Sequence, residues 1–341
     1  MTAQIPLIDL ELALSDDAPP ELLDAAREAA EQIGIIQVTN HGVPDELIDG
    51  FHDSIGRVLA LPRADKAELA SPTGHPYRGW RQWPDDFGRL ELERFIIGQF
   101  GSVEEAKAAG LSDEHAQLYA HPNVWPPQEP GLKDLAARYH DASVGVAEKV
   151  LTLYARLLGV PVGTFPTSGR PYYTSFVVND YPTWTYDDGG DTDQDKLLLL
   201  EHADGSALTV LHQRGDYAGL QGRGPDGEWI PVPIVPGALQ VFSGHILTKW
   251  TNGRLSAGTH RVVAGGSVTR RSTGVFWHPS LDTVIEPLAP FVGPEGSDYE
   301  PVLLWDQAKR QVEEYLEVFG RPDQVAAWRE GRPYVAELAE T

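Results

Sequence analysis

Cysteine is absent from the 341 residues, and methionine occurs only once. Without a thiol, the chain can form neither a disulfide nor a thiolate metal site, and it has no Cys nucleophile. No uninterrupted apolar run is long enough to cross a bilayer, so we expect no membrane partner. The first residues, MTAQIP, lack a basic region followed by an apolar core, so they do not read as a signal peptide. We therefore expect a cytoplasmic protein.

Positive charge is also scarce. Lys and Arg total 27 against 50 Asp and Glu, which gives a formal net charge of -23. Such a surface repels phosphate backbones, so we expect no nucleic-acid partner. Its main effect is solubility, although an acidic surface can also steer a cationic small molecule toward a cleft. The 41% of hydrophobic and 23% of charged residues are typical of a globular chain with a sizeable core.

Helical and β-rich patterns occupy different parts of the chain. Residues 5–10 indicate a short edge strand, and residues 35–39 form a second β-rich run before the turn-like Asn40-His41-Gly42. From Tyr172 to about Pro290, short apolar runs alternate with Gly and Pro turns, which is typical of a many-stranded antiparallel sandwich or barrel. The expected helices cover residues 21–33, 45–61, 132–158, 302–318 and 322–338.

A histidine and an aspartate stand together at the end of one expected strand. Leu197–Leu200 reads as buried, and the polar residues Glu201, His202 and Asp204 follow it. Residues two apart on a strand point to the same face, so His202 and Asp204 present one nitrogen and one oxygen donor side by side. A His-x-Asp pair is common by chance, so a third donor is needed to define a metal site.

His260 is the candidate for that third donor, because it begins the β-branched run His260–Val263. Two histidines and one carboxylate form the facial triad of non-haem Fe(II) oxygenases, which leaves three coordination positions open. Zinc remains an alternative on these donors alone. Further along, Arg270 and Ser272 have the spacing to bind one carboxylate together, as an oxygenase with a 2-oxoacid co-substrate requires. The alternative is an ordinary surface ion pair.

With these residues identified, the chain resembles the isopenicillin N synthase-like family of Fe(II)/2-oxoglutarate-dependent dioxygenases. The resemblance extends over most of the chain, and its parts follow the order of the family. They are IPLIDL at 5–10, GIIQVTNHGVP at 34–44, NVWP at 123–126, NDYP at 179–182, HADGSALTVLHQ at 202–213, GLQ at 219–221, WTNGR at 250–254, HRV at 260–262 and PSLD at 279–282.

The resemblance implies a mostly β fold with flanking helices: a double-stranded β-helix, or distorted jelly roll, with an α/β N-terminal region and C-terminal helices. It implies Fe(II) bound by His202, Asp204 and His260, with 2-oxoglutarate and O2 as co-substrates. It implies that Arg270 and Ser272 hold the distal carboxylate of 2-oxoglutarate, with Tyr181 and Asn179 in the same pocket.

The same resemblance divides one compact unit into four parts. They are an N-terminal region over 1–125, a helical connection over 126–170, a jelly-roll catalytic core over 171–290 and a C-terminal helical segment over 291–341, which we expect to lie over the barrel mouth as a lid.

Two departures from the family pattern are visible. His245 stands where many relatives have an Asp in a structural turn, and we expect a local change there and not a fourth ligand. The segment Thr183–Tyr186, followed by acidic residues, differs from the plant enzymes. We therefore expect an enzyme of bacterial secondary metabolism that hydroxylates, desaturates or cyclises a small molecule, without an obligate protein partner.

Substrate contacts are expected from the irregular front and from the strand that carries Arg270. The candidates are Tyr77, Arg78, Phe95, Phe276 and His278. For the aromatic residues core packing is an alternative, and for Arg78 a surface ion pair.

Three other functions are compatible with parts of this pattern. They are a 2-oxoglutarate-independent oxidase like isopenicillin N synthase, a non-catalytic jelly-roll binding protein and a zinc hydrolase. The chain has no nucleophile elbow to support hydrolysis.

The turn between the third ligand and the arginine poses a geometric question. A simple hairpin centred on Gly265-Gly266 would place His260 opposite Arg271 and send Arg270 to the outer face. If the resemblance holds, this connection needs an odd-membered loop or a bulge, and we predict that Arg270 faces inward.

Overall fold

The computed structural model describes residues 4–319 and Ala326, apart from residues 73, 76, 85–90, 167–172, 182–196, 216, 265–268 and 298. Two main β-sheets form the centre of this part of the chain. The larger sheet has the strand order β1-β2-β10-β7-β12-β5-β4-β3, and the smaller has the order β6-β11-β8-β9. In the larger sheet β1 runs parallel to β2, and the other pairs are antiparallel.

The strands are short and are separated by Gly- and Pro-containing turns, as the sequence pattern predicts. Those of the larger sheet are β1 (Leu7–Asp9), β2 (Ile35–Thr39), β3 (Gly79–Pro84), β4 (Glu91–Gly98), β5 (Tyr173–Tyr181), β7 (Leu208–Gly215), β10 (Leu239–Ser243) and β12 (Arg270–His278). Those of the smaller sheet are β6 (Leu197–His202), β8 (Leu220–Arg223), β9 (Trp229–Pro231) and β11 (His260–Val263).

A hydrophobic cluster joins the two sheets across the inside of the barrel. Leu198, Leu220 and Val262 of the smaller sheet pack with Tyr181 and Phe242 of the larger one. Burial of these apolar side chains between facing sheets is the main force that closes a jelly roll. The expected mostly β fold with a double-stranded β-helix core is confirmed.

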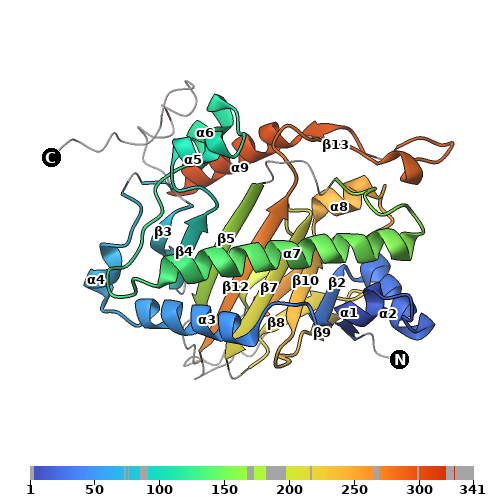
Figure 1. Ribbon diagram of the computed structural model, residues 1–341, viewed down its shortest axis with the longest axis horizontal. Coiled ribbons are helices and arrows are strands. Elements are labelled where there is room, and N and C mark those ends of the chain that lie inside the picture. The colour runs from blue at the N-terminus through green and yellow to red at the C-terminus, as the bar shows by residue number, and fades with distance from the viewer. Residues whose placement is uncertain are drawn as a thin grey trace.

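Helices cover the outer face of the larger sheet. The long helix α7 (Leu132–Leu158) crosses in front of the strands in Figure 1, and α3 (Asp45–Leu59) lies beside it. The buried residues of α7, such as Tyr139, Val146 and Leu153, recur at helical spacing. The helix ends where Gly159 adopts a φ of 68°, the left-handed conformation that only glycine adopts at little cost. The predicted bounds 132–158 are therefore confirmed.

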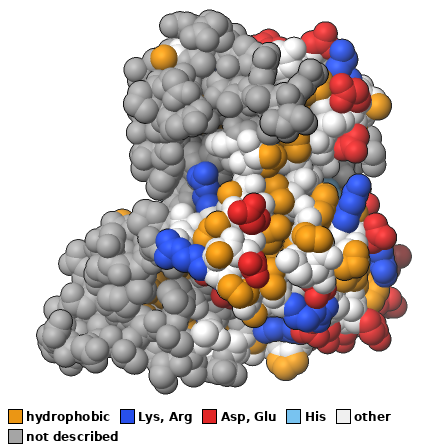
Figure 2. All heavy atoms as spheres, turned by 90° about the vertical axis from the view of Figure 1, so that its left-hand side faces the viewer, with side chains coloured by type: hydrophobic (Ala, Val, Ile, Leu, Met, Phe, Trp, Pro, Cys, Tyr) orange, Lys and Arg blue, Asp and Glu red, His pale blue; other side chains and the backbone are white. Residues whose placement is uncertain are grey.

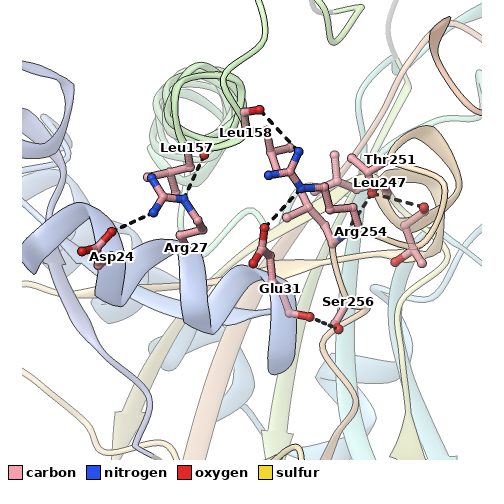
Figure 3. A network of polar contacts seen from close by, with 11 residues as sticks. Asp24, Arg27, Glu31, Leu157, Leu158, Leu247, Thr251, Arg254 and Ser256 are labelled. Atoms are coloured by element: carbon pink, nitrogen blue, oxygen red, sulfur yellow. Dashed lines mark hydrogen bonds and ion pairs between the residues drawn. The ribbon is translucent and has the colours of Figure 1, made fainter. Parts of the chain in front are cut away.

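Two arginines, one of them in the N-terminal part of the chain, bind the C-terminal end of α7 (Figure 3). Arg27 of α2 (Pro20–Gln32) donates a hydrogen bond to the carbonyl oxygen of Leu157 at 3.0 Å, and Arg254 donates one to that of Leu158 at 3.5 Å. The last carbonyls of a helix have no partner within it and carry a partial negative charge, which a guanidinium satisfies. The front of the chain is thereby attached to the helix that supports the sheet.

The structure also contains several shorter elements and a C-terminal helix. They are α1 (Leu10–Leu14), α4 (Arg63–Ala67), α5 (Val103–Ala108), α6 (Asp113–Tyr119), α8 (His245–Trp250), β13 (Val284–Ile285), η1 (Ala289–Phe291), β14 (Val302–Leu303) and α9 (Leu304–Phe319). The expected helices over 21–33, 45–61 and 302–318 correspond to α2, α3 and α9. The expected helix over 322–338 lies outside the described residues, apart from Ala326.

The connection between β11 and β12 is not the simple hairpin considered from the sequence. Within the described residues β11 pairs with β6 and β8 in the smaller sheet, whereas β12 pairs with β5 and β7 in the larger one. The chain therefore changes sheets between His260 and Arg270, and the register argument for a hairpin does not apply. The turn residues 265–268 themselves lie outside the described part.

The surface agrees with the negative net charge. In the described part of the face shown in Figure 2, acidic side chains lie along the right-hand and lower edges and near the centre, with hydrophobic and basic side chains between them. Among the described helices, none is long and apolar enough to cross a membrane.

Candidate metal and co-substrate site

Strand pairing brings the two candidate histidines together. His260 of β11 lies directly opposite His202 of β6, and their ring centroids are 4.3 Å apart. Asp204 follows two residues after His202, and its Oδ1 lies 3.8 Å from the Nε2 of His202. One donor atom from each of the three residues lies within 4.8 Å of the others. The geometry therefore provides two nitrogens and one oxygen around a single point.

Neighbouring groups orient all three side chains. The Nδ1 of His202 donates to the carbonyl oxygen of Leu200 at 2.8 Å, and that of His260 donates to the carbonyl oxygen of Gly258 at 2.9 Å. Each ring is thus held with Nε2 free to act as a ligand. The Oδ2 of Asp204 accepts a hydrogen bond of 2.6 Å from Thr209. Burial lowers the pKa of His260, which favours the neutral, metal-binding form.

A cavity of about 400 Å³ opens between the two sheets at this cluster. The odd-numbered residues of β5, from Tyr173 to Tyr181, face it, because alternate residues of a strand share a face. On β12 the residues Arg270, Ser272, Phe276 and His278 face it in the same way. The cavity therefore has one wall from the larger sheet and the candidate metal cluster on the other side.

Arg270 points into this cavity, as predicted. It is 1% exposed, and its guanidinium carbon lies 4.8 Å from the centre of the Tyr181 ring. One terminal nitrogen donates to Gln213 at 2.9 Å, whereas Nε and Nη1 are buried without a hydrogen-bond partner in the described structure. Ser272 is 1% exposed and lies two residues along the same face. A buried guanidinium with two unused donors is costly unless an anion occupies the cavity.

The amide of Asn179 is directly opposite Ser272 on the neighbouring strand. It lines the cavity, and its Oδ1 is buried without a partner. Tyr181 occupies the equivalent position opposite Arg270. All four residues expected around the co-substrate therefore lie on one patch of the cavity wall.

Only some of the residues that we expect to contact the substrate line the cavity. Tyr77, Phe276 and His278 line it. Phe95 does not, because it is fully buried in the hydrophobic core between the sheet and the helices. Arg78 does not either: it is buried, and it donates hydrogen bonds to the backbone carbonyls of Tyr77, Tyr119 and His121. The expectation that Arg78 and Phe95 line this cavity is corrected: a structural role for Arg78 and core packing for Phe95 describe these two residues better.

Other cavity residues were not identified from the sequence. Arg94 and Gln311 line the cavity from β4 and α9, while Gln213 and Thr209 bond to Arg270 and Asp204. The alternation of side chains along β4 could have identified Arg94 as a cavity residue. Arg94 lies opposite Asn179 of β5 and points to the same side of the sheet, whereas its neighbour Phe95 points to the other side.

Two further histidines fall where the sequence placed them. His41 lies in the turn after β2, where its ring contacts the carbonyl oxygen of Gly237 and the amide of Val43. His245 is exposed at the start of α8 and is not one of the clustered donors.

Two family models match the chain. One is described as "non-haem dioxygenase in morphine synthesis N-terminal" and matches residues 5–128. The other is described as "2OG-Fe(II) oxygenase superfamily" and matches residues 173–279, which contain all three clustered donors. The chain belongs to the 2-oxoglutarate–Fe(II) oxygenase superfamily. It is thus a non-haem Fe(II)- and 2-oxoglutarate-dependent dioxygenase, which uses Fe(II), 2-oxoglutarate and O2.

Oxygenases from plants and from a bacterium are similar to this one. Homoarginine-6-hydroxylase 2-ODD-C23 of Glycine max is 26% identical over 84% of this chain and 88% of its own length. Validamycin A dioxygenase of Streptomyces hygroscopicus subsp. limoneus is also 26% identical, over 86% and 82%. The solved structure of the dioxygenase for auxin oxidation in rice has a TM-score of 0.70 at 23% identity, covering 92% of this chain and 96% of the other. That structural likeness shows the shared fold.

Proposed function

We propose that this oxygenase binds Fe(II) through His202, Asp204 and His260 and binds 2-oxoglutarate through Arg270 and Ser272. The observation that carries the proposal is the pair of buried, unused N–H groups on Arg270, which face the same cavity as the three clustered donors. A dicarboxylate could bind the metal with one end and this guanidinium with the other.

The donor set fits Fe(II). Two imidazole nitrogens and one carboxylate oxygen on one side of a cavity match the facial triad, in which three positions stay open. The hydrogen bonds from Thr209 to Asp204 and from the two imidazoles to backbone carbonyls fix the donors before metal binds. Such preorganisation supports a metal site in preference to an accidental cluster.

The other end of the cavity fits a carboxylate. A guanidinium binds a carboxylate through charge-assisted N–H donors, and the Nε and Nη1 of Arg270 are two donor atoms that no group in the described structure uses. The Ser272 hydroxyl adds a third donor on the same face, and Tyr181 and Asn179 complete the wall. Tyr181 also covers one face of the guanidinium, which holds it in the plane that a bidentate contact requires.

We propose a small molecule as substrate, and hydroxylation, desaturation or ring closure in bacterial secondary metabolism as the reaction. Validamycin A dioxygenase, a Streptomyces relative by name and sequence, supports this context. Together with O2, bound Fe(II) and 2-oxoglutarate would supply an oxidant strong enough to remove hydrogen from a C–H bond. The chain holds the reactants in one orientation and keeps water away, with Tyr77, Phe276 and His278 on the substrate side.

An anaerobic titration tests the metal and co-substrate roles together. Fe(II) and then 2-oxoglutarate are added without oxygen, and the visible spectrum is recorded. We expect a weak metal-to-ligand charge-transfer band in the wild type and its loss in His202→Ala. Iron binding without the band would contradict the co-substrate assignment, and no iron binding would contradict the metal assignment.

A further inference from the structure

Gln213 lies beside the proposed carboxylate-binding arginine, on the neighbouring strand. β7 pairs with β12 so that Gln213 stands directly opposite Ser272. Residues that lie opposite each other on paired strands point to the same face of a sheet, so Gln213, Ser272 and Arg270 share the inner face. Gln213 is 2% exposed and does not itself line the cavity. An effect of this side chain on a bound ligand must therefore act through a neighbour.

The amide of Gln213 is held at both ends. Its Oε1 accepts a hydrogen bond of 2.9 Å from the Nη2 of Arg270, and its Nε2 donates one of 3.5 Å to the carbonyl oxygen of Val232. A guanidinium can only donate hydrogen bonds, so the contact with Arg270 fixes which end of the amide faces it. Within the part of the chain that the structure describes, Gln213 is the one hydrogen-bond partner of this guanidinium.

This contact leaves other N–H groups of Arg270 to a ligand. Gln213 accepts from Nη2, whereas Nε and Nη1 are buried without a partner in the described structure. The ring of Tyr181, whose centre is 4.8 Å from the guanidinium carbon, restricts the same group from one side. An arginine side chain has many rotamers, and one that is held before the ligand arrives loses less freedom on binding. Gln213 and Tyr181 together therefore preorganise the guanidinium.

The amide of Gln213 is suited to this role because it carries no charge. It accepts a hydrogen bond from Arg270 and leaves the positive charge to a bound anion. A carboxylate in the same place would form an ion pair with the guanidinium and would compete with the ligand for it. A glutamine at this position therefore fits a site that binds a carboxylate from outside the protein.

We propose that Gln213 is a positioning residue, which holds Arg270 in place and thereby makes the site select 2-oxoglutarate over 2-oxoacids that lack a second carboxylate. This inference rests on the proposed function, in which Arg270 binds the distal carboxylate. It goes further because it assigns part of the preference for a dicarboxylate to a side chain that does not line the cavity.

Two 2-oxoacids of matched shape test this role. 2-Oxovalerate has the carbon chain of 2-oxoglutarate with a methyl group in place of the distal carboxylate, and its metal-binding end is identical. Each is titrated without oxygen into the full-length enzyme loaded with Fe(II), and the charge-transfer band gives its Kd. We expect Gln213→Leu to raise the Kd for 2-oxoglutarate by about 10-fold, because the hydrogen bond that orients Arg270 is lost, and to leave the Kd for 2-oxovalerate within about twofold.

A second variant separates positioning from packing. Gln213→Glu keeps the size of the side chain and an acceptor for Arg270, but it adds a competing negative charge. We expect it to raise the Kd for 2-oxoglutarate more than Gln213→Leu does, because the new carboxylate pairs with the guanidinium. If Gln213 only filled space, each variant would change the Kd values of the two 2-oxoacids by the same factor.

Gln221 provides the matched control. It accepts a hydrogen bond of 2.7 Å from the Nε of Arg261, which lies opposite it on the neighbouring strand of the smaller sheet. This is the same kind of glutamine–arginine contact, and neither residue lines the cavity. Gln221→Leu should therefore keep the wild-type ratio of the two Kd values.

Two outcomes would overturn the inference. They are a wild-type ratio of the two Kd values in both Gln213 variants, and an equal loss of selectivity in Gln221→Leu. A wild type that binds both 2-oxoacids equally would instead contradict the proposed role of Arg270, on which the inference rests. Absence of the band with both 2-oxoacids would contradict the metal and co-substrate assignment itself.

Discussion

Thr209 donates a hydrogen bond of 2.6 Å to the Oδ2 of Asp204, and its own hydroxyl lies 3.0 Å from that of Ser206. All three residues are buried at the base of the cavity. The bond fixes the carboxylate so that Oδ1 faces the two imidazoles. Thr209 therefore positions a proposed ligand without contacting the metal.

Replacing Thr209 by Val tests this role, because Val has nearly the same shape but no hydroxyl. We expect the affinity for Fe(II) to fall by about 10-fold or more, as is typical when a partner of a metal-ligating carboxylate is lost. Competition with a chelator measures the affinity. Thr209→Ser, which retains a hydroxyl, is the control. An unchanged affinity in Thr209→Val would show that the bond has no positioning role.

Arg270 and Arg271 are adjacent in β12 and offer a paired comparison. Arg270 faces the cavity, whereas Arg271 faces outward and forms an ion pair of 2.8 Å with Asp180. We expect Arg270→Gln to raise the Kd for 2-oxoglutarate by about 100-fold with little change in Fe(II) binding, because a charged two-donor contact is lost. Titration of the charge-transfer band measures this Kd.

Arg271→Gln should give the opposite result. Its Kd for 2-oxoglutarate should remain within about twofold of the wild-type value, while the free energy of unfolding should fall by about 1 to 2 kcal/mol, as a partly buried ion pair is broken. Equal effects of the two variants on 2-oxoglutarate binding would contradict the assignment of Arg270.

Acid should destabilise the protein through a buried pair of histidines outside the active site. The Nδ1 of His212 lies 2.8 Å from the Nε2 of His52, between β7 and α3. Burial lowers the pKa of His212 to about 4, and burial together with the neighbouring His212 and arginines lowers that of His52. Both groups are therefore neutral in the folded protein near pH 7.

The sign of the pH effect follows from these shifts. In the unfolded chain a histidine binds a proton below about pH 6.5, whereas folded His212 does so only near pH 4. The contribution of neutral His212 to the free energy of unfolding is therefore present above pH 6.5. It is lost as the pH falls toward 4, by roughly 1 to 2 kcal/mol between pH 7 and pH 5. Urea unfolding at both pH values measures this loss. In His212→Gln the loss should be smaller, and an equal loss in variant and wild type would contradict the role of the pair.

Gly244 is required by the close approach of two chain segments. Its amide donates to the carbonyl oxygen of Ala207, and a Cβ at this position would overlap the carbonyl oxygen of Ser206, next to the turn that carries Asp204. We expect Gly244→Ala to lower the free energy of unfolding by about 1 to 3 kcal/mol, as overpacking does, and to weaken Fe(II) binding. Thermal unfolding with and without metal measures both effects.

Gly145 provides the matched control for this substitution. It lies within α7, and a Cβ there would meet no atom within 4 Å other than the neighbouring backbone of its own helix. Gly145→Ala should leave the protein unchanged or raise its stability by up to about 1 kcal/mol, because alanine favours the helix. A Gly244→Ala variant that is as stable as Gly145→Ala would show that the turn can adjust.

The sequence by itself determined the features that depend on local periodicity. The spacing of His202 and Asp204 at the end of an apolar run predicted that their side chains lie close together, and the apolar spacing of residues 132–158 defines α7. Both rest on side-chain directions that the backbone geometry fixes within a few residues. The order of the motifs along the chain also indicated the family and, through it, the cofactors.

Only the tertiary structure decided which distant residues meet. His260 reaches His202 because β11 pairs with β6, and Arg270 faces inward because the chain changes sheets before β12. Arg94 lines the cavity while Phe95 is buried in the core, since the register of β4 against β5 sets which of the two faces inward. Strand register and sheet membership arise from contacts between segments far apart in the chain, and local sequence patterns do not specify them.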